Sequence, residues 1–198
     1  MPQKAWDECL DARPIPDGAT VVLSLDGSFN GDSTALVAVQ VTDFPHVMVA
    51  GLWERVTTVE DWRVPILDVE QMIRDLCKRW RVVEVIADPS RWARSLEVLE
   101  GDGLPMAEFP QSAARMTPAT QRFTDMVNQR QLTHDGSPAL SRHVSNAVLK
   151  QDARGMRIYK EAQKSAKKID LAVAAIMGVE RACWHAASPA EVEPFILF

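Results

Sequence analysis

The chain has 198 residues, of which 46% are hydrophobic and 25% are charged, and its formal net charge is −5. This composition excludes wholesale disorder, and the length is sufficient for one domain with a buried core. The negative charge argues against a simple basic protein that coats nucleic acid. Because the sequence has neither a signal-peptide pattern nor an apolar stretch of the roughly 18 residues that a membrane span needs, we expect a soluble intracellular protein.

The motifs of several enzyme classes are absent from the sequence. It contains no Walker A motif, no G-x-G-x-x-G, no H-E-x-x-H and no G-x-S-x-G. A P-loop motor, a dinucleotide-binding site, a zinc protease and a serine hydrolase therefore have no support. The three cysteines form no C-x-x-C pair and the four histidines are scattered, which favours reduced thiols and structural histidines over a metal site built from these residues.

The first half of the chain predicts a mixed β-sheet. Residues 1–19 are polar and end in turn formers, so we expect an N-terminal arm or linker remnant whose Trp6 docks on another surface. Three apolar runs joined by short turns predict an antiparallel meander of strands at 20–26, 34–42 and 46–54. Alternating helical and strand patterns then predict added parallel strands, with helices at 64–80 and 90–99 and strands at 81–88 and 105–110.

The second half is mostly helical in pattern. Thr117 as N-cap and Pro118 at the first position predict a helix to about Gln131. A turn at 134–136, a helix at 138–149, a short strand at 155–159 and a last helix at about 168–185 follow. We therefore expect one domain over residues 20–185 and a C-terminal tail over residues 186–198.

Three aspartates stand at the ends of predicted elements. Asp26 closes the first strand, Asp88 closes the strand after the first long helix, and Asp170 begins the last helix. Residues just past strand ends gather at one edge of an α/β sheet, and a helix N-terminus favours negative charge. Each aspartate can also be explained as a turn former or a helix cap. The pattern predicts a carboxylate site without excluding these structural roles.

Carboxylates that are brought together repel one another unless cations neutralise them. Hard oxygen ligands select Mg²⁺ or Mn²⁺ over softer metals. Two such ions, about 3.5–4 Å apart, can activate a water molecule and stabilise the leaving oxygen of a phosphodiester. The three aspartates therefore indicate in-line hydrolysis by water or hydroxide, without a covalent enzyme intermediate.

Four segments in a fixed order carry a family resemblance. They are LDGSFNGDSTALVAV (25–39), VIADPSRW (85–92), TPATQRFTDMVNQRQLTHDGSPALSRHVSNAV (117–148) and KSAKKIDLAVAAIMG (164–178). Over roughly residues 20–185 the chain resembles the C-terminal nuclease domain of tailed-phage terminase large subunits, in the RNase H-like superfamily. The resemblance implies an α/β fold with a mixed central sheet, antiparallel in its first three strands and then parallel, flanked by helices.

The resemblance also implies a function. The chain would be a metal-dependent DNA endonuclease that cuts concatemeric viral DNA during packaging, with Asp26, Asp88 and Asp170 as catalytic ligands of two Mg²⁺ or Mn²⁺ ions and Asp26 bridging both. Asp32 is a candidate accessory ligand, although an Asx-type turn explains it slightly better. The implied partners are double-stranded DNA, an ATPase motor domain, the small terminase subunit and the portal, with no membrane, in the host cytoplasm.

One feature departs from the family pattern. Terminase large subunits normally include an N-terminal ATPase motor, whereas this sequence has no Walker A motif. The sequence is therefore either an isolated nuclease domain or fragment, or a chain that encodes the nuclease alone.

Basic residues are concentrated ahead of Asp170. Residues 142–168 include eight basic and two acidic side chains, a net charge of +6, whereas the rest of the chain has a net charge of −11. Such a segment can bind the DNA backbone without reading its sequence. The predicted DNA contacts are Lys160, Lys164, Lys167, Lys168, Arg91 and Arg94, with Lys160 and Lys168 nearest the scissile phosphate. A solvated lysine-rich loop is the alternative for each of them.

Two other functions fit parts of the sequence. One is a different RNase H-like nuclease, such as a junction resolvase or a transposase core. The other is a non-catalytic packaging module that docks on the portal or the motor and binds no metal.

Overall fold

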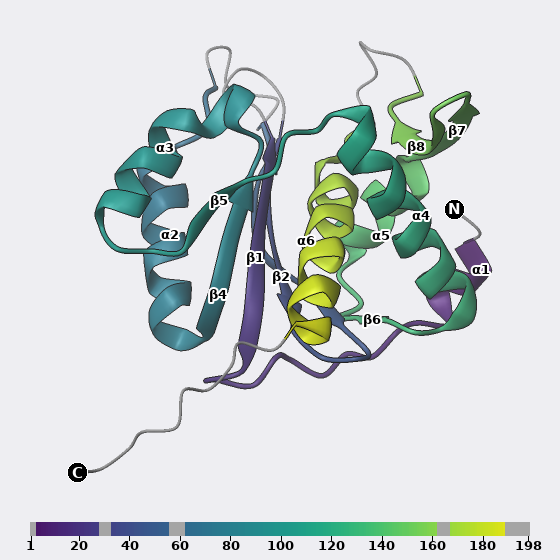
Figure 1. Cartoon of the computed structure of the whole chain (residues 1–198), viewed down its shortest axis with the longest axis horizontal. Coiled ribbons are helices and arrows are strands. Elements are labelled where there is room, and N and C mark those ends of the chain that lie inside the picture. Colours follow the sequence, from purple (N-terminus) through teal and green to yellow (C-terminus); the bar gives the residue numbers. More distant parts are fainter. Residues whose placement is uncertain (1–2, 28–32, 56–61, 162–166, 189–198) are drawn as a thin grey trace.

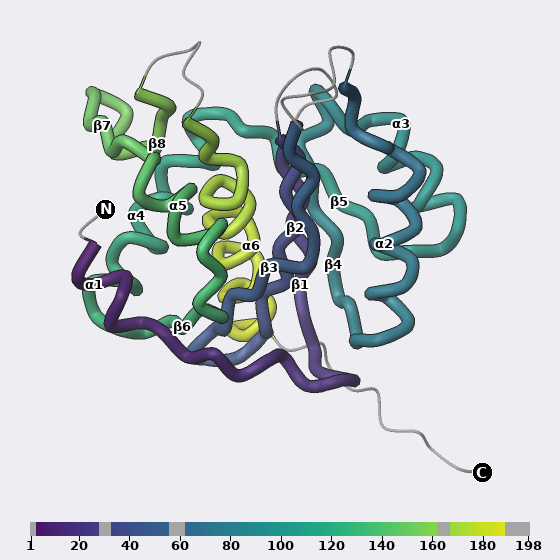
Figure 2. The backbone as a smooth tube through the Cα atoms, turned by 180° about the vertical axis from the view of Figure 1, so that it is seen from behind, coloured from purple at the N-terminus to yellow at the C-terminus, as the bar shows by residue number. Residues whose placement is uncertain are grey.

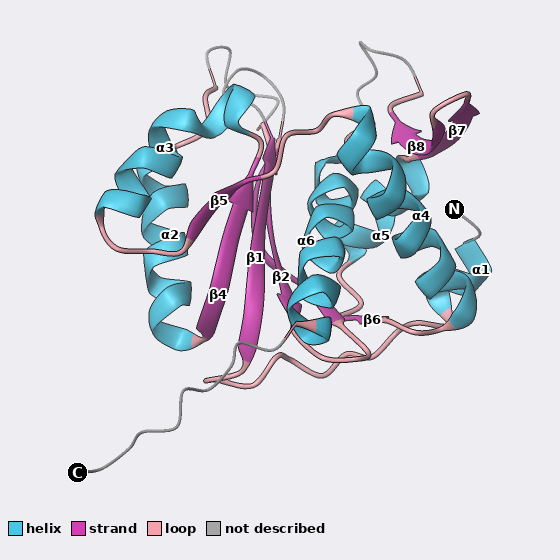
Figure 3. Cartoon of the chain, viewed as in Figure 1, coloured by secondary structure: helices cyan, strands magenta, loops and turns pink. Residues whose placement is uncertain are grey.

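The computed structural model describes residues 3–27, 33–55, 62–161 and 167–188. Its centre is a six-stranded mixed sheet in the order β5-β4-β1-β2-β3-β6 (Figures 1 and 3). The strands are β1 (Thr20–Gly27), β2 (Thr34–Gln40), β3 (His46–Trp53), β4 (Arg81–Ala87), β5 (Met106–Glu108) and β6 (Thr133–His134). The expected meander is confirmed, since β2 is antiparallel to both β1 and β3, and β4 and β5 add in parallel beyond β1.

Helices cover both faces of this sheet. On one face lie α2 (Ile66–Arg79) and α3 (Pro89–Gly101). On the other lie α4 (Ala113–Gln129), α5 (Pro138–Asn146), α6 (Asp170–Ala187) and the short α1 (Gln3–Asp7) (Figure 1). Successive residues of a strand point to opposite faces, so β1 and β2 contribute alternate side chains to the two apolar clusters. Burial on both faces explains why these strands read as continuous apolar runs.

The last helix, α6, is the central element of its layer. It packs against β1 and β2 and against α4 and α5, and its residues are buried almost without interruption from Asp170 to Val179. A helix that is apolar on all sides belongs in a protein interior. Because α6 lies directly on β1, its first residue is held close to the end of that strand.

Two helix boundaries differ from the expected ones by more than two residues. α4 begins at Ala113 rather than after Thr117, because Ser112 is the N-cap and its hydroxyl accepts a hydrogen bond from the Arg115 amide; Pro118 lies inside the helix. The helix expected over 138–149 ends at Asn146, and Ala147 is extended. The following residues form β7 (Val148–Asp152), which pairs antiparallel with β8 (Gly155–Tyr159) in a separate hairpin.

The N-terminal arm packs on the domain, as Trp6 indicated. The indole ring is fully buried, stacks on His134 with 4.0 Å between ring centroids, and donates a hydrogen bond to the Ser141 hydroxyl at 3.1 Å. Figure 2 shows the arm running from α1 past β6 to the start of β1. Within the described ranges, no helix has the length and apolar character needed to cross a lipid bilayer.

Candidate metal centre

Two buried aspartates meet where β1 ends and α6 begins. Asp26 is the second-to-last residue of β1, and the alternation along the strand places its side chain, like that of Ser24, on the face covered by α6. Asp170 is the first residue of α6. Asp26 is 8% exposed and Asp170 is 7% exposed. The fold therefore brings two of the predicted ligands together in its interior.

The electrostatics of Asp26 reflect this proximity. Burial raises the pKa of Asp26, and the nearby charge of Asp170 raises it further, to about 7. Asp88 contributes a smaller effect in the same direction. A positive charge placed beside these carboxyl groups would favour the ionised form of Asp26.

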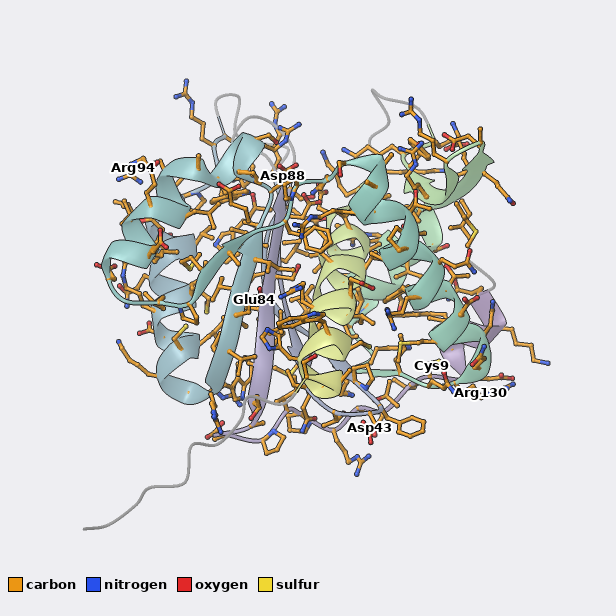
Figure 4. The ribbon with its side chains drawn as sticks, in the orientation of Figure 1. Cys9, Asp43, Glu84, Asp88, Arg94 and Arg130 are labelled. Atoms are coloured by element: carbon orange, nitrogen blue, oxygen red, sulfur yellow. The ribbon has the colours of Figure 1, made fainter. Side chains whose placement is uncertain are left out.

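Asp88 lies at the same edge of the sheet but in a different environment. It follows β4, which runs parallel to β1, so both strands end at this edge (Figure 4). Its side chain is only partly buried and caps α3, where Oδ1 accepts a hydrogen bond from the Ser90 amide at 3.0 Å. Asp88 therefore has the helix-cap role that the sequence allowed, and it also lies near Asp26.

Two neutral side chains hold the buried carboxylates. Gln111, in the segment between β5 and α4, donates from Nε2 to Asp26 Oδ1 at 2.7 Å. Ser33 is fully buried, and its hydroxyl donates to Asp170 Oδ2. Sequence reasoning missed both residues. The strand-end argument that selected Asp88 also applies to Gln111, which follows β5 at the same edge.

The donor set fits a hard divalent cation, because the groups that could ligate it are carboxylate oxygens and the Ser33 hydroxyl oxygen. In the described residues, however, no group of three or more His, Cys, Asp or Glu side chains is arranged closely enough to form a ready-made metal site. Asp26 and Asp170 are the two predicted ligands that the fold already brings together, and Asp88 would have to approach them to complete such a site. The predicted accessory ligand Asp32 lies outside the described residues.

The predicted lysine contacts lie along the connection from β8 to α6. Lys160 follows β8, Lys168 precedes Ile169 and Asp170, and Lys167 forms an ion pair with Glu161 at 2.8 Å. Lys164 lies outside the described residues.

The two predicted arginines on α3 differ in their surroundings. Arg91 is exposed in the first turn of α3, three residues after Asp88. Arg94 forms an ion pair with Glu70 of α2 at 3.1 Å, and Figure 4 shows it on the outer side of the α2–α3 layer, away from Asp88.

Comparison with known proteins gives the family. The family model for the terminase large subunit, endonuclease domain, matches residues 46–186. The chain belongs to this family. The matched region contains Asp88 and Asp170, whereas Asp26 precedes it.

One curated relative aligns with most of this chain. The Gene 13 protein of Mycobacterium phage L5 is 30% identical over an alignment of 179 residues, and the match covers 83% of this chain and 29% of the relative. The chain thus spans less than a third of that relative's length.

Solved structures agree with the family at the level of the fold. The large terminase of bacteriophage HK97 superposes with a TM-score of 0.75 at 22% identity, over 91% of this chain and 43% of that chain. The large terminase nuclease of thermophilic phage G20c with bound magnesium superposes with a TM-score of 0.63 at 14% identity, over 89% of this chain and 95% of that chain. The RNase H-like terminase nuclease fold expected from the sequence is confirmed.

Proposed function

We propose that the chain is a divalent-metal-dependent endodeoxyribonuclease that cuts concatemeric viral DNA during genome packaging. The observation that supports this proposal most strongly is the buried pair of Asp26 and Asp170, with Asp88 at the same sheet edge. A structural helix cap explains Asp88 alone, but it does not explain two carboxylates buried side by side. Membership of the terminase endonuclease family supplies the class of reaction.

Asp26, Asp88 and Asp170 would hold two Mg²⁺ or Mn²⁺ ions, with Asp26 shared between them and Asp32 as an accessory ligand. When bound, such ions lower the pKa of a coordinated water and stabilise the leaving oxygen. The G20c nuclease, which has this fold, is described with bound magnesium. In this chain Gln111 would orient Asp26 through the hydrogen bond to Oδ1, and Ser33 would orient Asp170.

The basic segment would bind the DNA backbone beside this centre. Lys160, Lys164, Lys167 and Lys168 lie in or next to the connection between β8 and α6, which leads directly to Asp170. Arg91 would contact the strand on the Asp88 side. Arg94 is the weakest member of the proposed set, because Glu70 already pairs with its guanidinium.

The biological partners follow from the proposed reaction. A packaging nuclease acts on double-stranded DNA in the host cytoplasm together with an ATPase motor, a small terminase subunit and a portal. The chain spans less than a third of the length of the phage L5 relative, and the proposal concerns the nuclease step alone.

Plasmid nicking tests the proposal. With Mg²⁺ or Mn²⁺ the purified protein should convert supercoiled plasmid to nicked and linear forms, and EDTA should stop the reaction. Asp26→Asn and Asp170→Asn should each lower the rate by at least about 100-fold, because the metal ligands act as a unit.

Asp43→Asn is the matched control for this experiment. It makes the same change of charge at an exposed position on the opposite side of the molecule from Asp88 (Figure 4), and it should leave nicking unchanged. Cleavage that survives Asp26→Asn would overturn the proposal. Absence of both cleavage and metal binding in the wild type would instead favour the non-catalytic packaging module.

A further inference from the structure

The helix that presents Asp170 has no cap of its own. The N-cap position of α6 is Ile169, and no side-chain hydrogen bond caps the helix there. The first amides of an α-helix have no partner within the helix, and a buried helix start needs acceptors from elsewhere. Because Asp170 is the first helical residue, whatever supplies these acceptors also fixes the backbone of the proposed metal ligand.

Helix α5 supplies hydrogen bonds on both sides of Asp170. The Nδ1 atom of His143 accepts a hydrogen bond from the Leu171 amide at 3.0 Å. The Nδ2 group of Asn146 donates to the Lys168 carbonyl oxygen at 3.0 Å. His143 and Asn146 are three residues apart on α5 and therefore lie on the same side of that helix.

The tautomer of His143 is fixed by its second ring nitrogen. Nε2 lies 3.0 Å from Glu54 Oε1, just after β3. Since Nδ1 accepts the Leu171 amide proton, Nε2 must be protonated and must donate to Glu54. Arg142 donates to both Glu54 oxygens at 2.9 and 2.8 Å, so the carboxylate is itself held in place. The imidazole is fully buried and can satisfy both nitrogens only in this orientation.

We propose that His143 and Asn146 are positioning residues that hold the backbone around Asp170 in the geometry needed for metal binding, and that Glu54 fixes the His143 tautomer this requires. This inference rests on the proposed function, because it assumes that Asp170 is a metal ligand. Neither side chain hydrogen-bonds the Asp170 carboxylate, whose hydroxyl donor is Ser33. Residues that orient ligands in this way typically change metal affinity by about 10–100-fold when they are replaced.

Two substitutions at His143 separate its two hydrogen bonds. Asparagine places an amide oxygen near the position of Nδ1 and can still accept from the Leu171 amide. Glutamine reaches the position of Nε2 and can still donate to Glu54, but it provides no acceptor for Leu171. The proposal predicts that His143→Gln weakens Mn²⁺ binding by about 10–100-fold and that His143→Asn stays within about threefold of the wild type.

Calorimetric titration with Mn²⁺ alone measures this effect without any reaction. Each variant is titrated at a temperature where circular dichroism shows it to be folded. Equal affinity for the wild type and His143→Gln would overturn the inference, as would equal losses in the two variants. If His143→Gln does not fold, Asn146→Ala provides a second measurement. We expect this variant to lose Mn²⁺ affinity several-fold, because one of the two backbone contacts disappears. An unchanged affinity would again overturn the inference.

His134 is the matched control. It is also buried, and its Nδ1 also accepts a backbone amide, that of Gly136 at 3.2 Å, but it packs against Trp6 rather than against α6. His134→Gln should lower the unfolding temperature and leave Mn²⁺ affinity unchanged. Failure of the proposed function is distinguishable, since the wild type itself would then bind no Mn²⁺ or would bind it equally well after Asp170→Asn.

Discussion

Asp26 is a carboxylic acid in an environment that opposes its ionisation. Burial and the neighbouring Asp170 raise its pKa to about 7, whereas the hydrogen bond from Gln111 acts in the opposite direction. The sequence was sufficient to select Asp26, because an aspartate that closes an apolar strand is visible without a structure. The Gln111 contact was not predictable in the same way, because the two residues are 85 positions apart and meet only through the order of the strands.

The raised pKa of Asp26 predicts how stability depends on pH in the absence of metal. Between pH 4 and pH 7 the folded protein keeps a proton on Asp26 that the unfolded chain has released, so the free energy of unfolding falls as pH rises through this range. Asp26→Asn removes this loss. At pH 8 in EDTA the variant should be more stable than the wild type by about 2–4 kcal/mol, and at pH 4 the difference should nearly vanish.

Urea unfolding at pH 4, 6 and 8 in EDTA measures this dependence. Asp43→Asn, at an exposed position, serves as the control and should show no such trend. If the difference in stability between Asp26→Asn and the wild type did not grow in favour of the variant from pH 4 to pH 8, the explanation given for Asp26 would be contradicted.

At the scale of elements, the metal centre depends on how closely α6 packs against β1 and β2. Gly178 makes this approach possible, because a Cβ atom there would lie 2.8 Å from Val39 Cγ2 and 3.2 Å from Ser24 Cβ. Ser24 is two residues before Asp26 on the same face of β1. The helix that bears Asp170 is thus in direct contact with the strand that bears Asp26.

Gly178→Ala should therefore damage both the fold and the metal centre. The added methyl group must push α6 away from the sheet by a few tenths of an ångström, and overpacking of this kind costs about 1–3 kcal/mol. Urea unfolding should show the loss of stability, and calorimetry should show weaker Mn²⁺ binding. Gly101→Ala, at the end of α3 where a Cβ meets nothing within 4 Å, should leave both quantities nearly unchanged. Equal behaviour of the two variants would contradict the packing argument.

The elements that the sequence predicted well are those whose pattern is local. The strands β1 to β4 are apolar runs bounded by turns, and the observed ends lie within two residues of the expected ones. β7 was missed because its exposed residues have no apolar face and are stabilised by pairing with β8. β6 has two residues and exists through its pairing with β3, a contact between segments far apart in the chain.

At the scale of the whole molecule, charge is unevenly distributed along the chain. The +6 segment over residues 142–168 leads into the N-terminus of α6, while the rest of the chain is acidic. Several of these basic side chains already have partners, since Arg142 pairs with Glu54, Arg157 with Asp152 and Lys167 with Glu161. The net charge of −5 is therefore compatible with DNA binding that is local, weak and dependent on salt.

Removal of two predicted phosphate contacts tests whether the basic segment binds DNA. The double variant Lys160→Ala/Lys168→Ala should lower the slope of log affinity against log salt by about 2, one for each lost contact, with similar effects on unrelated DNA sequences. Fluorescence anisotropy with labelled duplex DNA in EDTA measures the slope. Lys78→Ala removes one exposed lysine from α2 and should not change it. A slope that is the same in the double variant and the wild type would exclude these lysines as contacts.

The central claim is that Asp26, Asp170 and Asp88 together hold divalent metal at the edge of the sheet. Anomalous diffraction from crystals soaked in Mn²⁺ tests it most directly. We expect anomalous density between Asp26 and Asp170, with Asp88 drawn closer to the metal. Crystals with fully ordered aspartates and no density there, or with density only at other side chains, would contradict it.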